Sequence, residues 1–218
     1  MKSFKGWAVV LSLVVIGVAC STDRPKTITF TTQQDIDGAA TGGNWEEVAA
    51  SRHVQCTIAD VEVGDLGSSS YDERVPRGRW TKIEGDRSNR CGDDFETLMW
   101  RLANCERERK RVQPLSCDLR LVWSARAHSR DMTDQGYFDH FSPNGESPFD
   151  RMEKRGMVFS RAGENIAFTP TMGIAHLGWM TSPDHRKNIL NGEFTHGGVG
   201  VVRTEEGYFL TGLFLTPP

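Results

Sequence analysis

From residue 93 onward, apolar residues recur three and four positions apart, which is the spacing of an amphipathic helix. The first such set is Phe95, Leu98, Met99, Leu102 and Cys105. Asp93 precedes it with Glu96 three residues later, which is the pattern of a capping box, and Pro114 ends it. The sequence therefore predicts a helix that begins at about Asp93.

Two more helices are bounded by residues that commonly begin or end a helix. One begins after Asp118 and ends at Gly136, since glycine is common just past a helix end. Its apolar face is formed by Leu121, Val122, Ala125, His128 and Met132. A shorter helix opens at Ser147, which is followed by proline in the first helical position, and ends at Gly156.

The last third of the chain predicts one more helix and two strands. Residues 174–180 are helical in pattern, and Pro183 is interpreted as the end of that stretch. Residues 199–203 and 208–214 are strand-like and are joined by a turn at 205–207. Helices followed by a hairpin predict a domain, residues 93–218, in which helices pack against a small sheet.

The chain before residue 93 has a different character. Residues 54–63 alternate between apolar and polar, as a strand does, and residues 79–83 form a second such stretch. We interpret residues 53–92 as a small β-rich module of unknown role. Residues 20–52 are polar and rich in glycine and threonine, which predicts a flexible tether.

Residues 1–19 have the pattern of a secretory signal peptide. Two lysines precede an uncharged, mostly apolar run that is shorter than the roughly 20 residues of a membrane-spanning helix. The run ends in Gly-Val-Ala-Cys-Ser, which resembles a bacterial lipoprotein cleavage site, so Cys20 would become the lipidated first residue. The alternative is ordinary cleavage nearby, with Cys20 removed or left free. We expect an exported protein, held by lipid in the cell envelope, at the outer membrane where there is one, or secreted.

The cysteine count agrees with lipidation. The chain has five cysteines, and without Cys20 an even number remains, which suits two disulfides in an oxidising compartment. Of the three possible pairings, Cys105–Cys117 with Cys56–Cys91 is the simplest. The sequence contains no CxxC pair, so a redox motif or a zinc knuckle has no support.

The charge of the chain argues against one class of partner. The formal net charge is −3, and it becomes −5 without the two lysines of the signal peptide. An acidic chain has no electrostatic attraction to nucleic acid. The partner that the sequence does indicate is a membrane, through the lipid on Cys20.

Three polar segments fit neither a core nor a solvated surface. They are Gly136-Tyr137-Phe138-Asp139-His140-Phe141-Ser142-Pro143, Gly163-Glu164-Asn165-Ile166-Ala167 and Trp179-Met180-Thr181-Ser182-Pro183-Asp184-His185-Arg186. In order and separation they resemble the CAP superfamily, the cysteine-rich secretory, antigen 5 and pathogenesis-related proteins with a bacterial SCP-like branch. The resemblance extends over about residues 93–214. It includes Asn104-Cys105-Glu106-Arg107, Ala127-His128-Ser129-Arg130-Asp131-Met132 and Gly198-Val199-Gly200-Val201.

The resemblance implies an α-β-α sandwich, with a small and mainly antiparallel sheet, whose cleft carries two histidines and two acids. These positions fall on His140, Glu164 and His185, and the fourth is Ser182 in this chain. Two imidazoles and one carboxylate can hold zinc or another divalent metal, with water as the fourth ligand. The alternative is a hydrogen-bonded network that holds the loops together. Both interpretations predict that His140, Glu164 and His185 converge.

Two kinds of function remain open. The first is a protein that binds a lipid, a cell-wall fragment or a protein in the cleft of His140, Glu164, Ser182 and His185 without transforming it. The second is a metal-assisted, peptidase-like hydrolase that uses zinc-bound water, with Glu164 as ligand or base. Ser182 replaces the carboxylate that would be the obvious base, which favours binding. A third hypothesis treats the domain as a structural spacer.

Lipidation at Cys20 can be tested by metabolic labelling with palmitate. We expect label in the wild-type protein and none in Cys20→Ala, because the thiol is the site of the lipid. Equal labelling of the two proteins, or label in neither, would disprove the lipid anchor.

Overall fold

The computed structural model describes residues 10–16, 56 and 90–218. Cys20, the predicted tether at 20–52 and almost all of the predicted module at 53–92 lie outside these residues, so those interpretations stay predictions. No helix in the described part of the chain is long and apolar enough to cross a membrane.

The first long helix, α3 (Asp94–Arg109), begins where the sequence predicts. The Asp93 carboxylate accepts a hydrogen bond from the Glu96 N–H, and the Glu96 side chain accepts one from the Asp93 N–H. This capping box pairs two N–H groups that would otherwise be left unsatisfied at the helix start. The predicted start of this helix is confirmed.

The second long helix, α4 (Leu119–Gln135), is also bounded as predicted. The Asp118 carboxylate accepts the Arg120 N–H at 2.9 Å, and Gly136 ends the helix with φ of 68°, a conformation that glycine adopts without steric cost. The whole predicted apolar face is buried, namely Leu121, Val122, Ala125, His128 and Met132.

Three shorter helices follow, α5 (Pro148–Lys154), α6 (Met172–Thr181) and α7 (Pro183–Ile189). The first two confirm the predictions, and Ser147 caps α5 through a second capping box. The sequence pattern did not predict α7, because Pro183 was interpreted only as the end of the preceding helix. Proline fits the first turn of a helix, where its missing N–H costs nothing, and Pro183 opens α7 there.

Five strands form one sheet in the order β1-β3-β5-β4-β2. They are β1 (Val10–Ile16), β2 (Ser116–Cys117), β3 (Arg161–Thr169), β4 (His196–Arg203) and β5 (Tyr208–Thr216). All neighbours are antiparallel except β2 and β4. The predicted hairpin is β4 and β5, whereas β3 was interpreted as a loop and is instead an interior strand.

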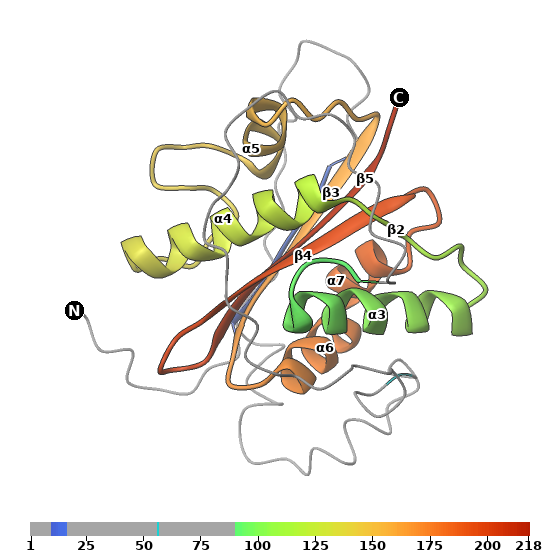
Figure 1. Cartoon of the computed structure of the whole chain (residues 1–218), viewed down its shortest axis with the longest axis horizontal. Coiled ribbons are helices and arrows are strands. Elements are labelled where there is room, and N and C mark those ends of the chain that lie inside the picture. Colours follow the sequence, from blue (N-terminus) through green and yellow to red (C-terminus); the bar gives the residue numbers. More distant parts are fainter. Residues whose placement is uncertain (1–9, 17–55, 57–89) are drawn as a thin grey trace.

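Helices cover both faces of the sheet (Figure 1), with α4 and α5 on one side and α3, α6 and α7 on the other. Successive side chains of a strand point to opposite faces. β5 accordingly contributes Leu213 and Leu215 to the core under α4 and α5, and Leu210 and Phe214 to the core under α3 and α6. The expected α-β-α sandwich with a mainly antiparallel sheet is confirmed.

The glycines of β4 let α4 approach the sheet closely. A Cβ atom on Gly200 would lie 1.9 Å from the backbone nitrogen of Arg126, and one on Gly198 would lie 2.7 Å from the backbone nitrogen of Val122. The close approach also lets the Ser129 hydroxyl of α4 donate to the Gly200 carbonyl at 3.0 Å. The glycine-rich stretch at 197–200 therefore serves helix–sheet packing.

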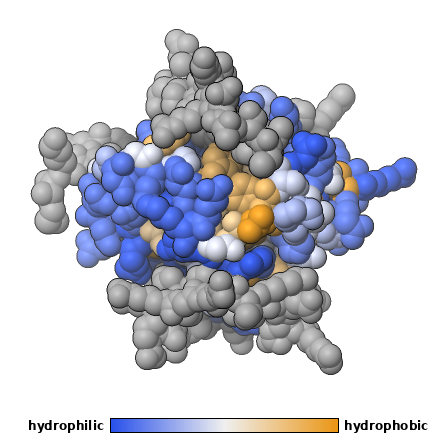
Figure 2. All heavy atoms as spheres, turned by 90° about the horizontal axis from the view of Figure 1, so that it is seen from above, coloured by the Kyte–Doolittle hydropathy of each residue, from blue (hydrophilic) through white to orange (hydrophobic). Residues whose placement is uncertain are grey.

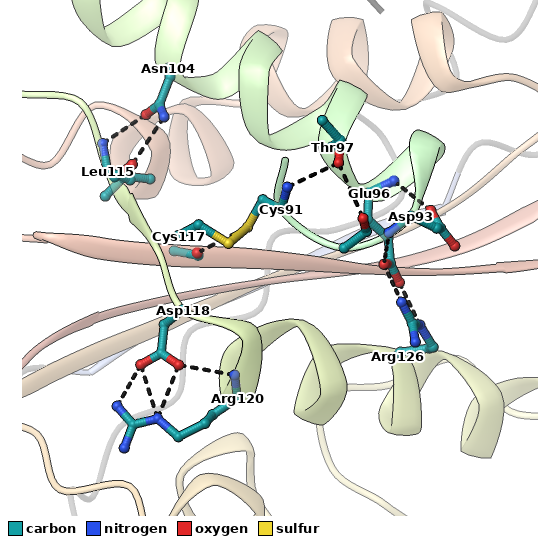
Figure 3. Close-up of a disulfide and its surroundings, with 12 residues drawn as sticks. Cys91, Asp93, Glu96, Thr97, Asn104, Leu115, Cys117, Asp118, Arg120 and Arg126 are labelled. Carbon is teal, nitrogen blue, oxygen red and sulfur yellow. Dashed lines mark hydrogen bonds and ion pairs between the residues drawn. A yellow bond between two sulfur atoms is a disulfide. The ribbon is translucent and has the colours of Figure 1, made fainter. Parts of the chain in front are cut away.

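β2 pairs with β4 only at His196 and Gly197, so the rest of that edge of β4 has no neighbouring strand among the described residues. A buried ion pair covers part of this edge. Glu96 of α3 pairs with Arg126 of α4, and its Oε1 also accepts the Val201 N–H of β4 at 3.3 Å. Figure 3 shows the two side chains pointing toward each other from their helices. The pair thus joins the two helix layers past the edge of the sheet.

Arg107 joins α3 to the segment that follows it and to the C-terminal end of α7 with the residues beyond. Its side chain is fully buried and donates to four backbone carbonyls, those of Gln113, Ile189, Asn191 and Phe194. Burial lowers the pKa of Arg107 to about 10, so the guanidinium stays charged at neutral pH.

The edge strand β1 comes from the centre of the predicted signal peptide. Val10 pairs with Phe168 and Ile16 with Ala162, so these seven residues cover the outer edge of β3 in the full chain. Cleavage before Cys20 would remove β1 and make β3 an edge strand.

Both disulfides differ from the simplest pairing. Cys56 is bonded to Cys105 and Cys91 to Cys117, so the predicted pairs Cys105–Cys117 and Cys56–Cys91 are wrong, although all four cysteines are bridged. The Cys91 N–H donates to Thr97, which holds Cys91 beside α3 and within reach of β2 (Figure 3). The two bridges therefore tie residues 56 and 91 to the sandwich.

The face seen from above in Figure 2 is hydrophilic around one hydrophobic area. Among the described residues Val158, which follows α5, is the large apolar side chain that is most exposed, at 71%. Its neighbour Phe159 and Phe149 of α5 are partly buried against the core. Apolar exposure among the described residues is thus small.

Peptide mapping under non-reducing conditions tests the disulfides. We expect linked peptides for Cys56–Cys105 and Cys91–Cys117. Replacing Cys91 and Cys117 together by serine should lower the free energy of unfolding by about 3 to 4 kcal/mol, because the bridge closes a loop of 26 residues. A linked Cys105–Cys117 peptide would contradict the structure.

Candidate functional site

The carboxylate of Glu164 lies at the centre of a buried polar cluster. Glu164 is in β3, with no exposed surface, and its side chain points to the α4 and α5 face. Its neighbour Asn165 points to the opposite face, where it contacts α7. The two-residue period of the strand therefore decides which residues can reach Glu164.

Two side chains engage both oxygens of Glu164. The His140 ring contacts Oε1 through Nδ1 at 2.7 Å, and the Arg151 guanidinium donates to Oε2 at 2.8 Å. His140 comes from the segment after α4, and Arg151 comes from α5. A loop, a helix and a strand thus meet at one carboxylate.

Arg151 holds the rest of the loop in place as well. It is 7% exposed, and its NH1 group donates to the His140 carbonyl at 2.9 Å and to the Glu146 carbonyl at 3.1 Å. The same group lies 3.5 Å from the Ser142 hydroxyl. Losing Arg151 would free both the carboxylate and the 140–146 loop.

These contacts determine the charge of Glu164. Burial by itself would raise its pKa, but the nearby Arg151, His128 and His140 outweigh burial and hold the pKa at about 2. The carboxylate is therefore ionised at every physiological pH. An ionised carboxylate can only accept hydrogen bonds, so His140 Nδ1 is the protonated nitrogen and donates to Glu164 Oε1.

A second network lies next to this pair. His128 Nε2 contacts the Asp139 carbonyl at 3.0 Å, and the Tyr137 hydroxyl donates to Asp131 and lies 3.4 Å from Ser142. Burial lowers the pKa of His128 and raises that of Tyr137. Although desolvation acts in the opposite direction, hydrogen bonds from Tyr137 and Gln135 lower the pKa of Asp131.

A pocket of about 440 Å³ opens beside this network, between α4, α5 and the loop that precedes α5. Its lining is polar and charged. The lining side chains are Ala127, His128, Asp131, Gln135, Ser142, Asn144, Glu146, Arg151 and Arg155. Arg151 therefore belongs both to the pocket wall and to the Glu164 cluster.

His185 and Ser182 lie on the other face of β3. The His185 ring contacts the Ser182 hydroxyl through Nδ1 at 2.7 Å, and the His185 carbonyl accepts from the Asn165 side chain at 3.1 Å. Asn188 completes this second cluster by donating to Asn165 and to the Glu164 carbonyl. The structure joins His140 directly to Glu164 and joins the His185 ring to Ser182, and the convergence of all three residues stays a prediction.

These contacts bear on the metal hypothesis. Within residues 10–16, 56 and 90–218, no group of three His, Cys, Asp or Glu side chains is arranged to hold a metal ion. Both oxygens of Glu164 are engaged, and the Nε2 atom of His140 is buried without a hydrogen-bond partner among the described residues. His140, Glu164 and His185 do not fit a shared zinc ion in this arrangement, so we derive no chemistry through one.

Arg151 was not among the residues expected at the site, and His128 was expected in the core because it lies on the apolar face of its helix. His128 is buried, as expected, but it also lines the pocket. The spacing of α5 could have indicated Arg151, because it shares one buried helix face with Pro148 and Met152, three residues before it and one after it.

Comparison with known proteins places this domain in a wider group. Residues 100–216, more than half of the chain, match CAP, the cysteine-rich secretory protein family. The uncharacterized protein YkwD of Bacillus subtilis is 47% identical over 124 residues, 56% of this chain and 47% of that protein. The uncharacterized membrane protein YlbC of the same organism is 36% identical over 143 residues, 65% of this chain and 39% of that protein. The chain thus spans less than half the length of each relative.

Solved structures agree with the fold. An extracellular protein containing a SCP domain from Bacillus anthracis superposes with a TM-score of 0.50 at 36% identity, covering 56% of this chain and 40% of that one. An outer surface protein of Borrelia burgdorferi superposes with a TM-score of 0.55 at 16% identity, covering 63% of this chain and all of that one. The second similarity concerns the fold alone.

The ionised state of Glu164 predicts a loss of stability in acid. Its pKa is about 2 in the folded chain and 4.5 in an unperturbed carboxyl group. A depressed pKa stabilises the fold above pH 4.5, and this contribution is lost as the pH falls from there toward 2. The lost contribution is on the order of 3 kcal/mol.

Urea unfolding at pH 7, 5 and 3 would measure this effect. Glu164→Gln should lower the free energy of unfolding at pH 7 by about 3 kcal/mol, because Arg151 is left buried and unpaired, and should show a smaller further loss at pH 3 than the wild type. Glu193→Gln is the control, since Glu193 forms an exposed pair with Arg161. Equal acid sensitivity of the wild type and Glu164→Gln would contradict the assignment.

Proposed function

The chain belongs to the cysteine-rich secretory protein (CAP) family, and we propose that it acts outside the cytoplasm as a lipid-anchored module that binds a ligand without transforming it. The ligand is a small polar molecule, such as a soluble cell-wall fragment. It occupies the pocket lined by His128, Asp131 and Arg151 rather than a cleft shared with His185.

The protonation states around the pocket support binding over catalysis. General acid–base catalysis needs a group whose pKa lies near the working pH. Here the pKa of Glu164 is held at about 2, those of Asp131 and His128 are lowered, and that of Tyr137 is raised. Every one of these shifts moves a titration away from neutrality. The observation that carries the proposal is geometric: His140 and Arg151 engage both oxygens of Glu164, so its carboxylate is not free to act as a base or a nucleophile.

The lining of the pocket supports a polar ligand. Amide, hydroxyl and charged groups surround it, and Ala127 is its one aliphatic lining residue. Since Arg151 is held by four acceptors, this part of the wall is preformed and little ordering is needed on binding. Such a site suits a sugar or a short peptide better than an acyl chain.

A variant that fills the pocket tests the proposal. Ala127→Trp should weaken binding of a soluble peptidoglycan digest, measured by saturation-transfer NMR, by about tenfold or more, because the indole occupies the ligand's space. Asp134→Trp is the matched control, since Asp134 is exposed on the same helix and does not line the pocket.

Mass spectrometry of the ligand after incubation separates binding from hydrolysis. We expect fragments of unchanged mass with the wild type, with or without added zinc. Cleaved fragments that disappear in Glu164→Gln would establish an enzyme instead. Equal binding by Ala127→Trp and wild type would place the ligand elsewhere.

A further inference from the structure

One positive charge in the pocket has no partner among the described residues. Arg155 follows directly after α5 and lines the pocket. Its Nε atom is buried without a hydrogen bond, and no carboxylate of the described chain forms an ion pair with it. A buried guanidinium nitrogen left unpaired is unfavourable, so something that accepts hydrogen bonds is expected beside it.

The other charges around the pocket are already engaged. Arg151 is paired with Glu164, and Glu146 is paired with Lys154. Asp131 accepts hydrogen bonds from Tyr137 and Gln135. The carboxylates that line the pocket therefore have partners of their own, and Arg155 is the cation left over.

Arg155 also lies close enough to Arg151 to be repelled by it. Burial, and next the charge of Arg151, lower the pKa of Arg155. An anion beside Arg155 would oppose both effects, because it would supply acceptors and reduce the repulsion between the two guanidinium groups.

We infer that Arg155 is a binding residue for an anionic group of the ligand, a carboxylate or a phosphate. This inference rests on the proposed function and adds a charge requirement to it. The planar guanidinium can donate two parallel hydrogen bonds to either group, which a lysine cannot do. The side-chain amides of Gln135 and Asn144, which also line the pocket, are available for uncharged parts of the same ligand.

Three sugars that differ in charge would test the inference by calorimetry. N-acetylmuramic acid carries a carboxylate, N-acetylglucosamine 6-phosphate carries a phosphate, and N-acetylglucosamine carries neither. We expect the wild type to bind one or both anionic sugars at least about tenfold more tightly than the neutral one, as for hydrogen bonds to charged groups. The difference between the two anions identifies which group the site prefers.

Three variants assign that preference to Arg155. Arg155→Gln should abolish the advantage of the anionic sugar, so that anionic and neutral sugars bind this variant with similar affinity. Arg155→Lys should retain part of the advantage, because the charge remains but the paired donors are lost. Lys187→Gln removes the same charge from the exposed surface of α7 and should behave as the wild type.

Two results would overturn the inference, and they differ in what they say of the pocket. Equal binding of all three sugars, with Arg155→Gln unchanged, would leave a ligand-binding pocket without an anion requirement. No binding of any sugar by the wild type would reject both the anion site and a sugar ligand for the pocket.

Discussion

The burial of one carboxylate organises this half of the sandwich. Glu164 has no exposed surface, and an ionised group in that position is tolerated only when it is paired and hydrogen-bonded. His140 and Arg151 provide those bonds from a loop and from α5. Arg151 also donates to the His140 and Glu146 carbonyls, so the guanidinium that pairs with Glu164 holds the 140–146 loop of the pocket wall as well.

The period of β3 then divides the polar residues of the family's motifs between two faces. Glu164 serves the face with the pocket, whereas Asn165, one residue on, bonds to the His185 carbonyl and to Asn188 on the α7 face. The second cluster holds α7 against the strand through the His185 carbonyl and the Asn188 side chain. Adjacent residues of one short motif therefore perform different tasks.

The helices and the hairpin could be predicted because their signals are local, as the caps at Asp93 and Asp118 and the C-terminal Gly136 show. β3 could not be predicted, because both of its faces are buried and the strand therefore lacks an alternation of apolar and polar residues. Its polar residues Glu164 and Asn165 form hydrogen bonds with residues that are distant in the sequence. The same reason explains the error in the disulfides. Cys105 and Cys117 are close in sequence, but they project toward different segments once α3 and β2 are packed.

The pocket is lined by one arginine whose side chain is held by hydrogen bonds and one whose side chain has no hydrogen-bond partner among the described residues. Together they determine which ligands the pocket can recognise. Arg151 cannot turn toward a ligand without breaking its bond to Glu164, so its contribution is to the shape and the field of the site. Arg155 has no such partner in the described chain, and it lines the pocket directly after the end of α5. In such a site the unpaired guanidinium of Arg155 distinguishes anionic from neutral ligands. The paired guanidinium of Arg151 keeps the shape of the pocket in which Arg155 makes that distinction.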